Sequence, residues 1–222
     1  MCKKADDIVV YACDVGSTRG ENFGWAKCEN GEIKLGTNKI DELVNELSKS
    51  LYKKPVALGF ECPCFLPIPG KSAQLSKGRV NEHDRSCFAP AGGYVATLGI
   101  HQMAFIFDNI KQNVLKVSVN YSEWDKEPKS LFIWEAFVSG AAHSDDNNHM
   151  QDAATAVDEF IKRYNNGSLG NSDVTIPVGS ECISLAGLAC RWSNLPYTND
   201  VLREELMVIK PTEQYKNEIE NS

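Results

Sequence analysis

Hydrophobic residues form several short continuous runs, and the first of them sets the pattern for the chain. Residues 7–15 are mostly apolar, with Asp14 near the end of the run, and Gly16, Ser17 and Thr18 follow. A run of this kind predicts a strand that is buried on both faces. Residues 23–28 alternate, an Asn-Gly hairpin signal follows at 30–31, and residues 33–36 continue the alternation. The pattern therefore predicts three antiparallel strands in succession.

The next part of the chain alternates between helical and strand patterns. Residues 41–52 carry leucines at helical spacing and predict a helix. Residues 55–61 form a second buried strand, which the intervening helix places parallel to the first. Further helices are predicted at 94–112, 144–164 and 183–192, and further strands at 131–137 and 206–209.

Residues 62–93 interrupt this alternation. The segment is rich in Pro, Gly, Ser and charged residues, and no apolar periodicity runs through it. Loops of this length in a compact domain are usually functional or mobile. Because the segment leaves the sheet directly after Glu61, we expect it to border any site at that strand end.

Composition narrows the class of protein. The chain has 222 residues, 42% of them hydrophobic and 24% charged, which is typical of one globular domain. No apolar run is long enough to span a membrane, and we expect no signal peptide. Eight irregularly spaced cysteines, several in apolar runs, favour buried thiols in the cytoplasm over disulfides. Cys62 and Cys64 are too close for the common zinc pair.

The charge balance bears on the partner. A net charge of −7 argues against a broad nucleic-acid-binding surface, because phosphate binding requires clustered Lys and Arg. A local basic cluster is nevertheless present within the long loop. Its members are Lys71, Lys77, Arg79, His83 and Arg85.

Acidic residues occupy positions where burial is costly. Asp14 and Glu61 end two buried strands, and Glu135 lies within a third. A buried carboxylate needs an arginine, hydrogen-bond donors or a cation beside it. On the helix predicted at 144–164, His149 and Asp152 are three residues apart and share a face.

The positions of these acids resemble those of a known superfamily. The order β-β-β-α-β-α-β-α, with acids at the ends of the first and fourth strands and in a late helix, resembles the ribonuclease H-like superfamily. The similarity is to its predicted nuclease branch and covers about residues 7–165. The His149-x-x-Asp152-Ala153 pattern looks like the final-helix motif of Holliday-junction resolvases. The motifs are Asp14–Ser17 with Gly24–Ala26, Leu58–Pro63, Trp134–Phe137 and His149–Ala154.

The resemblance implies a fold and an activity. The fold would be α/β, with a mixed five-stranded sheet (three antiparallel strands, then two parallel ones) flanked by helices. One domain would cover residues 1–222, with a core at about 7–165 and a helical extension at 174–222. The activity would be metal-dependent phosphodiester hydrolysis of nucleic acid, DNA or RNA, at a carboxylate site holding two Mg²⁺ or Mn²⁺ ions.

The same resemblance suggests roles for individual residues. Asp14, Glu61, Asp152 and His149 would be catalytic, and their carboxylates would converge at one end of the sheet. Asp14, Glu61, Asp152 and Glu135 would be the metal ligands. The substrate contacts would be Lys77, Arg79, Arg85 and Ser17.

Structural roles are alternatives for each of these residues. Asp152 is equally a solvated helix acid, His149 a surface or packing histidine, and Glu61 a turn carboxylate. Glu135 either binds a second metal or holds a basic residue in an ion pair. Asp145 and Asp146 are most simply helix-capping residues.

Two other functions remain compatible with the sequence. Gly16, Ser17 and Thr18 after the first strand also resemble the phosphate-binding turn of actin-like ATPases and sugar kinases. Those proteins duplicate the domain, whereas this chain holds one copy of the motif. The acidic net charge equally suits a binding or scaffold module with a degenerate site.

Overall fold

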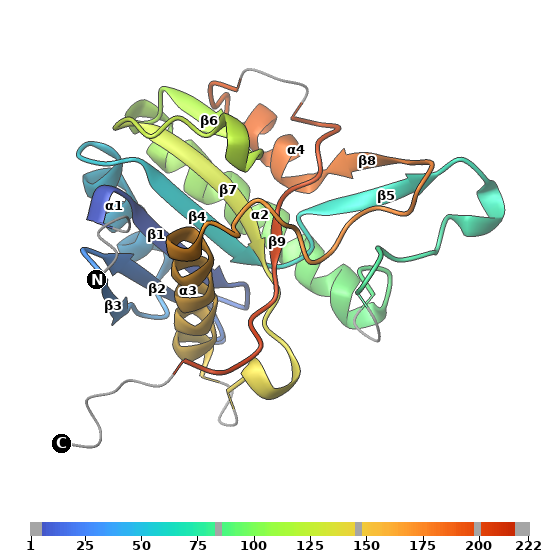
Figure 1. The fold of residues 1–222 in the computed structure, drawn as a ribbon, viewed down its shortest axis with the longest axis horizontal. Coiled ribbons are helices and arrows are strands. Elements are labelled where there is room, and N and C mark those ends of the chain that lie inside the picture. Colours follow the sequence, from blue (N-terminus) through green and yellow to red (C-terminus); the bar gives the residue numbers. More distant parts are fainter. Residues whose placement is uncertain (1–5, 83–85, 145–147, 198–200, 216–222) are drawn as a thin grey trace.

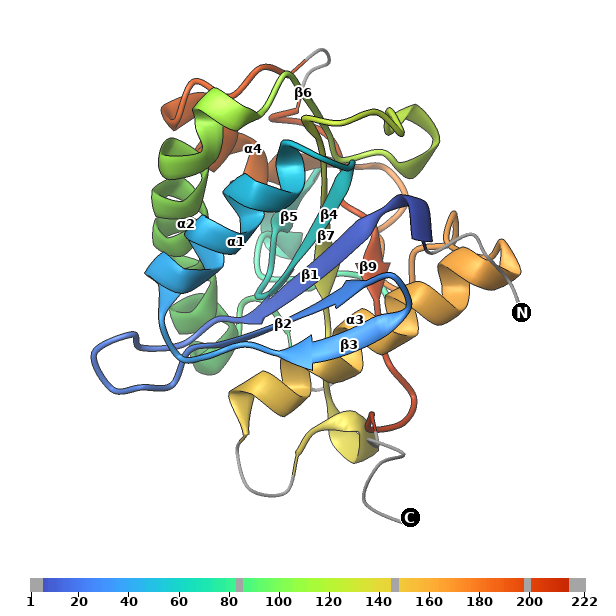
Figure 2. The same ribbon diagram turned by 90° about the vertical axis from the view of Figure 1, so that its left-hand side faces the viewer.

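The computed structural model describes residues 6–82, 86–144, 148–197 and 201–215. Within them, a seven-stranded sheet forms the centre of the molecule and helices cover both of its faces (Figures 1 and 2). The main path of the sheet runs β3-β2-β1-β4-β7-β6, and β9 also pairs with β7. The sheet strands are β1 (Val9–Asp14), β2 (Gly24–Glu29), β3 (Glu32–Leu35), β4 (Val56–Glu61), β6 (Lys116–Ser118), β7 (Ser130–Ala136) and β9 (Val208–Ile209).

The predicted α/β class with a mixed sheet is confirmed. β1, β2 and β3 pair antiparallel, and β4 and β7 continue the sheet in parallel with β1. The two short strands β6 and β9 both lie parallel to β7 along its other edge. The sheet is thus wider than the five strands that were predicted.

Two hydrophobic clusters hold the layers together, one on each face of the sheet. α1 (Ile40–Leu51), α2 (Pro90–Ile110) and α4 (Leu185–Trp192) cover one face. α3 (His149–Asn166) covers the other face, where alanines such as Ala153 and Ala156 let the helix approach the strands closely. Figure 2 shows α1 and α2 on one side of the sheet and α3 on the other.

The segment 62–93 is more ordered than the sequence indicates. β5 (Phe65–Pro69) pairs antiparallel with β8 (Ser180–Ser184), and this two-stranded ribbon extends away from the main sheet (Figure 1). α2 begins at Pro90, four residues before the predicted start, because proline is well suited to the first turn of a helix. The loop prediction therefore fails at both places.

The C-terminal part is not a purely helical extension. It contains β8 and β9 as well as α4, and β9 adds to the main sheet beside β7. The seven cysteines within the described residues are free, buried thiols, as predicted. Among the described helices, none combines the length and apolarity that crossing a membrane would need.

Candidate functional site

Asp14 and Glu61 lie side by side at the carboxyl ends of two parallel strands. They are register partners in the pairing of β1 with β4. Cys13 and Phe60 pack in the cluster beneath α1 and α2. Because side chains alternate along a strand, the next residues, Asp14 and Glu61, both point to the opposite face, toward α3. Strand register alone therefore brings two of the predicted acids together.

α3 brings His149 to the same place. Nδ1 of His149 lies 2.5 Å from Oδ2 of Asp14. The helix begins there because Asn148 caps it, with its side chain accepting a hydrogen bond from the backbone N–H of Gln151. His149 is thus not a free surface histidine but the partner of Asp14.

Gly24 permits this close approach. It is the register partner of Asp14 on β2, directly beneath the first turn of α3. A Cβ atom at this position would lie 2.4 Å from the carbonyl carbon of His149 and 2.5 Å from the nitrogen of Met150. Those atoms belong to the backbone, so they cannot move aside cheaply. Gly24 belongs to one of the sequence motifs, but its role in the approach of α3 could not be predicted from that motif.

Asp152 is fully buried next to the pair, which rules out the solvated-acid alternative. Its Oδ1 accepts a hydrogen bond of 2.7 Å from the backbone N–H of Ser144. Its Oδ2 accepts no hydrogen bond from any described residue, and Nε2 of His143 lies 3.4 Å away. His143 is a second site residue that the sequence did not predict, since it belongs to none of the motifs.

The carboxylates and the histidine influence one another's proton affinity. Burial raises the pKa of Asp14, and the hydrogen bond from His149 opposes that shift. The hydrogen bond to Asp14 raises the pKa of His149, although partial burial works against it. The negative charge of Asp152 raises the pKa of both groups. The site therefore favours a proton held between Asp14 and His149.

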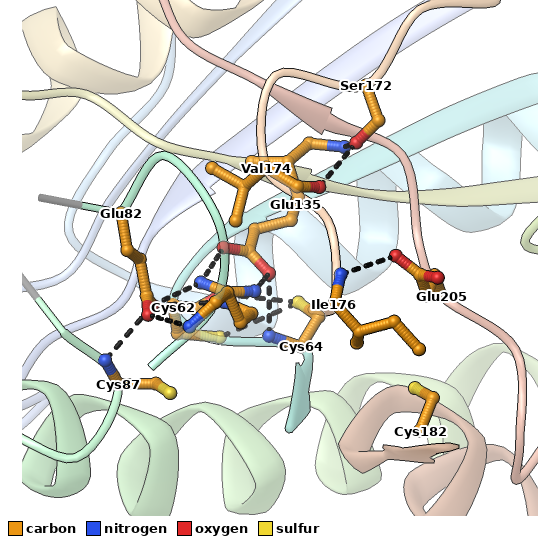
Figure 3. A network of polar contacts seen from close by, with 12 residues as sticks. Cys62, Cys64, Glu82, Cys87, Glu135, Ser172, Val174, Ile176, Cys182 and Glu205 are labelled. Carbon is orange, nitrogen blue, oxygen red and sulfur yellow. Dashed lines mark hydrogen bonds and ion pairs between the residues drawn. The ribbon is translucent and has the colours of Figure 1, made fainter. Parts of the chain in front are cut away.

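Glu135 points to the other face of the sheet and makes an ion pair there (Figure 3). Its two carboxylate oxygens accept hydrogen bonds of 2.7 Å from the two terminal nitrogens of Arg79. One of those oxygens also accepts the backbone N–H of Cys64. Of the two roles left open for Glu135, the structure shows the ion pair with a basic residue.

The side chain of Arg79 takes part in the same network. Its side chain is fully buried, and its guanidinium also contacts Glu82 at 2.8 Å. Glu82 in turn accepts the backbone N–H groups of Arg79 and Cys87. The network ties the segment around Arg79 to the end of β7, which is a structural role for a residue predicted to contact substrate.

A cleft of about 280 Å³ lies between the strand ends and the first turn of α2. Both ends of the 62–93 segment contribute to its wall, as predicted from the position of that segment after Glu61. The described residues that line it include Asp14, Val15, Glu61, Cys62, Pro63, Ser86, Ala89, Ala91, Gly92 and Glu135.

The other predicted substrate contacts are less well placed. Lys77 is exposed, and Ser17 is half-buried with its Oγ accepting a hydrogen bond from the N–H of Gly20. Neither residue belongs to the cleft lining. Arg85, Asp145 and Asp146 lie outside the described residues.

The predicted metal ligands do not form an assembled metal site among the described residues. Within the described part of the chain, no group of three or more His, Cys, Asp or Glu side chains could hold a metal ion as it stands. Comparison of the chain with family models, curated proteins and solved structures finds no match. The function is therefore inferred from the site itself.

Proposed function

We propose that this cleft is the active site of a metal-dependent nuclease that hydrolyses phosphodiester bonds in nucleic acid. The observation that carries the proposal is the register pairing of Asp14 with Glu61, which puts two carboxylates on one face at the cleft. In open α/β sheets, ligands bind at the carboxyl ends of the strands. A pair of acids at that place suits a hard cation such as Mg²⁺ or Mn²⁺.

The strand order supports the ribonuclease H-like fold that the sequence resembles. The path β3-β2-β1-β4-β7 has three antiparallel strands followed by two parallel ones, and β1 and β4 are its neighbouring central strands. A helix that packs on the Asp14 face supplies His149 and Asp152. β6 and β9 would then be additions along the edge of β7.

The residues fit a divalent ion in type and place but are not assembled around one. The buried Oδ2 of Asp152 accepts no hydrogen bond from the described residues and has Nε2 of His143 3.4 Å away, so a bound cation would further compensate its charge. We propose that Asp14 and Glu61 would hold the metal, with Asp152 as the third acid. Asp14 would then exchange its contact with His149 for the ion.

The chain's own groups have distinct tasks in this proposal. Bound metal would neutralise charge on the phosphate and lower the pKa of an attacking water. His149, once released from Asp14, would hold a proton or orient a water next to the reacting phosphate. Residues of the 62–93 segment, including Lys77, would face the rest of the nucleic acid.

The experiment is cleavage of labelled single-stranded, duplex and branched DNA and RNA with Mg²⁺, with Mn²⁺ or with EDTA. We expect metal-dependent cleavage that Asp14→Asn reduces by on the order of 10²-fold or more, the range for loss of one catalytic group. Asp41→Asn is the matched control, because Asp41 is an exposed aspartate on α1. Cleavage that persists in Asp14→Asn would refute the proposal.

A second function has two observations in its favour. The described residues hold no assembled metal group, and the net charge of −7 does not suit a broad nucleic-acid-binding surface. A binding or scaffold module with a degenerate site would have both properties. Calorimetry separates the two functions, because the module would neither bind Mg²⁺ or Mn²⁺ at Asp14 nor cleave any of the substrates.

A further inference from the structure

A second cleft, larger than the first, lies on the far side of α2. It has a volume of about 990 Å³ and runs between α2 and α4. The two helices lie side by side in both views of the fold (Figures 1 and 2). The described residues that line it all come from these helices and are Ile100, His101, Ala104, Phe105, Asp108, Asn109, Leu188, Ala189, Arg191 and Trp192.

Aromatic side chains stand exposed on both walls of this groove. Trp192 on α4 is 67% exposed, and Phe105 on α2 is 42% exposed. Tyr94, eleven residues before Phe105 and therefore about three helical turns away, is 62% exposed. Trp, Tyr, Phe and Arg are the residue types that concentrate in the centres of protein interfaces. The groove thus has the composition of a contact surface.

The charges at the groove identify the partner. Asp108 lies on the α2 wall and Arg191 on the α4 wall. Lys111 contacts Oδ1 of Asp108 at 2.6 Å, and Nη1 of Arg191 donates a hydrogen bond of 3.4 Å to the hydroxyl of Tyr197. A partner of one charge sign would leave one wall opposed by a like charge, whereas a second copy offers both signs.

We propose that a second copy of this chain docks in the groove and forms a two-fold symmetric dimer. A two-fold axis repeats every contact, so each pair of residues that meets across the interface occurs twice. Asp108 therefore faces Arg191 of the partner subunit, and Arg191 faces Asp108 of the partner subunit. α2 and α4 of both copies pack together, and Phe105 and Trp192 become buried at the centre. Among the described residues, none lines both this groove and the cleft at Asp14, so the dimer proposal can be tested independently of the nuclease proposal.

The test is sedimentation velocity over a series of protein concentrations, with charge reversals that can rescue each other. We expect the wild type to dimerise reversibly. Asp108→Arg and Arg191→Asp should each raise the dissociation constant by about tenfold or more, because each change occurs twice in the symmetric contact. The double variant, Asp108→Arg with Arg191→Asp, should restore association because the pairs re-form with reversed polarity.

Fluorescence provides an independent readout of the same contact. Trp25, Trp124 and Trp134 are buried, so Trp192 is the exposed tryptophan among the four of the chain. Acrylamide quenching should therefore decrease as wild type dimerises and should stay high in the single reversals. The matched control is Asp41→Arg with Arg203→Asp, two exposed charges away from the groove.

Two results would overturn the dimer. One is a wild-type chain that stays monomeric at every concentration. The other is a dimer that both single reversals leave unchanged, since it would use a different surface. Circular dichroism of each variant checks that the fold is retained, and the rescue by the double variant cannot arise from unfolding.

Discussion

At the scale of single residues, the contact between Asp14 and His149 defines the candidate site. The hydrogen bond that His149 donates to Asp14 raises the pKa of His149, so the histidine stays protonated to higher pH in the folded chain. A pKa raised above its unfolded value stabilises the fold fully below that unfolded value, about 6.5. The stabilisation is lost as the pH rises through the folded pKa of His149.

We predict that Asp14→Asn lowers the pKa of His149, because the neutral amide no longer favours the imidazolium. An NMR titration of the histidine ring protons measures this directly. Thermal denaturation across the same pH range should show a smaller loss of stability above pH ~6.5 in Asp14→Asn than in wild type. Asp41→Asn should leave the His149 titration as it is in wild type. An unchanged His149 pKa in Asp14→Asn would show that the contact is absent in solution.

A second residue-scale prediction concerns the buried ion-pair network. Arg79→Ala leaves Glu135 and Glu82 buried without their cation. Removing one partner of a buried pair costs about 3–5 kcal/mol, so the free energy of unfolding should fall by that amount. Urea denaturation measures the loss, and Lys77→Ala, two residues away but exposed, should change stability by less than about 0.5 kcal/mol. Equal effects of the two substitutions would contradict the structural role of Arg79.

At the scale of elements, the docking of α3 on β2 decides whether the site forms. Gly24→Ala places a methyl group against the backbone of His149 and Met150. Overpacking of this kind costs about 1–3 kcal/mol, and it should also move the first turn of α3 away from Asp14. We therefore predict a lower free energy of unfolding together with a His149 pKa closer to its ordinary value.

Gly170→Ala is the control for this substitution. A Cβ at Gly170 would meet no atom within 4 Å, so this variant should keep both the stability and the His149 titration of wild type. If Gly24→Ala destabilised the fold but left the His149 pKa unchanged, α3 would not depend on Gly24 for its position.

The elements that could be predicted are those with their own hydrophobic pattern. The first three strands, the helices at 40–51 and 149–166, and the strands ending at Glu61 and Ala136 follow from periodicity. β6 has three residues, too few for any period, and it exists because β7 offers an open edge. The strand predicted at 206–209 is present as β9, but its pairing along the same edge of β7 could not be predicted from two residues. β5 depends in the same way on β8, more than a hundred residues later in the chain.

At the scale of the whole molecule, the sequence could predict only the part of the site that lies at the ends of the strands. Asp14 and Glu61 could be placed together because parallel strands share an edge. Glu135 and Arg79 form an ion pair although they are 56 positions apart in the chain. Arg79 lies in a loop that has no hydrophobic periodicity, so this contact could not be predicted. The burial of Asp152 and the approach of His143 likewise depend on how α3 and the segment before it pack. Such contacts are set by tertiary packing and leave no trace in local sequence.

The last prediction tests the metal site through the stability of the whole molecule. A ligand that binds only the folded state stabilises it by RT ln(1 + [L]/Kd), about 1.4 kcal/mol at ten times Kd. For a chain of this size that corresponds to an increase in Tm of roughly 3–6 °C. We expect Mg²⁺ or Mn²⁺ to raise the Tm of wild type and of Asp41→Asn, and to have no effect on Asp14→Asn.

This measurement does not require a known substrate, so it separates metal binding from catalysis. The metal could raise the Tm of wild type but not of Asp14→Asn, while no nucleic acid is cleaved. The chain would then bind metal at Asp14, and its substrate would not be among those assayed. Equal increases in the Tm of wild type and of Asp14→Asn would mean that the ion binds at another place on this acidic chain. No shift in any variant would favour a scaffold in which the proton between Asp14 and His149, and not a metal, compensates the buried carboxylates.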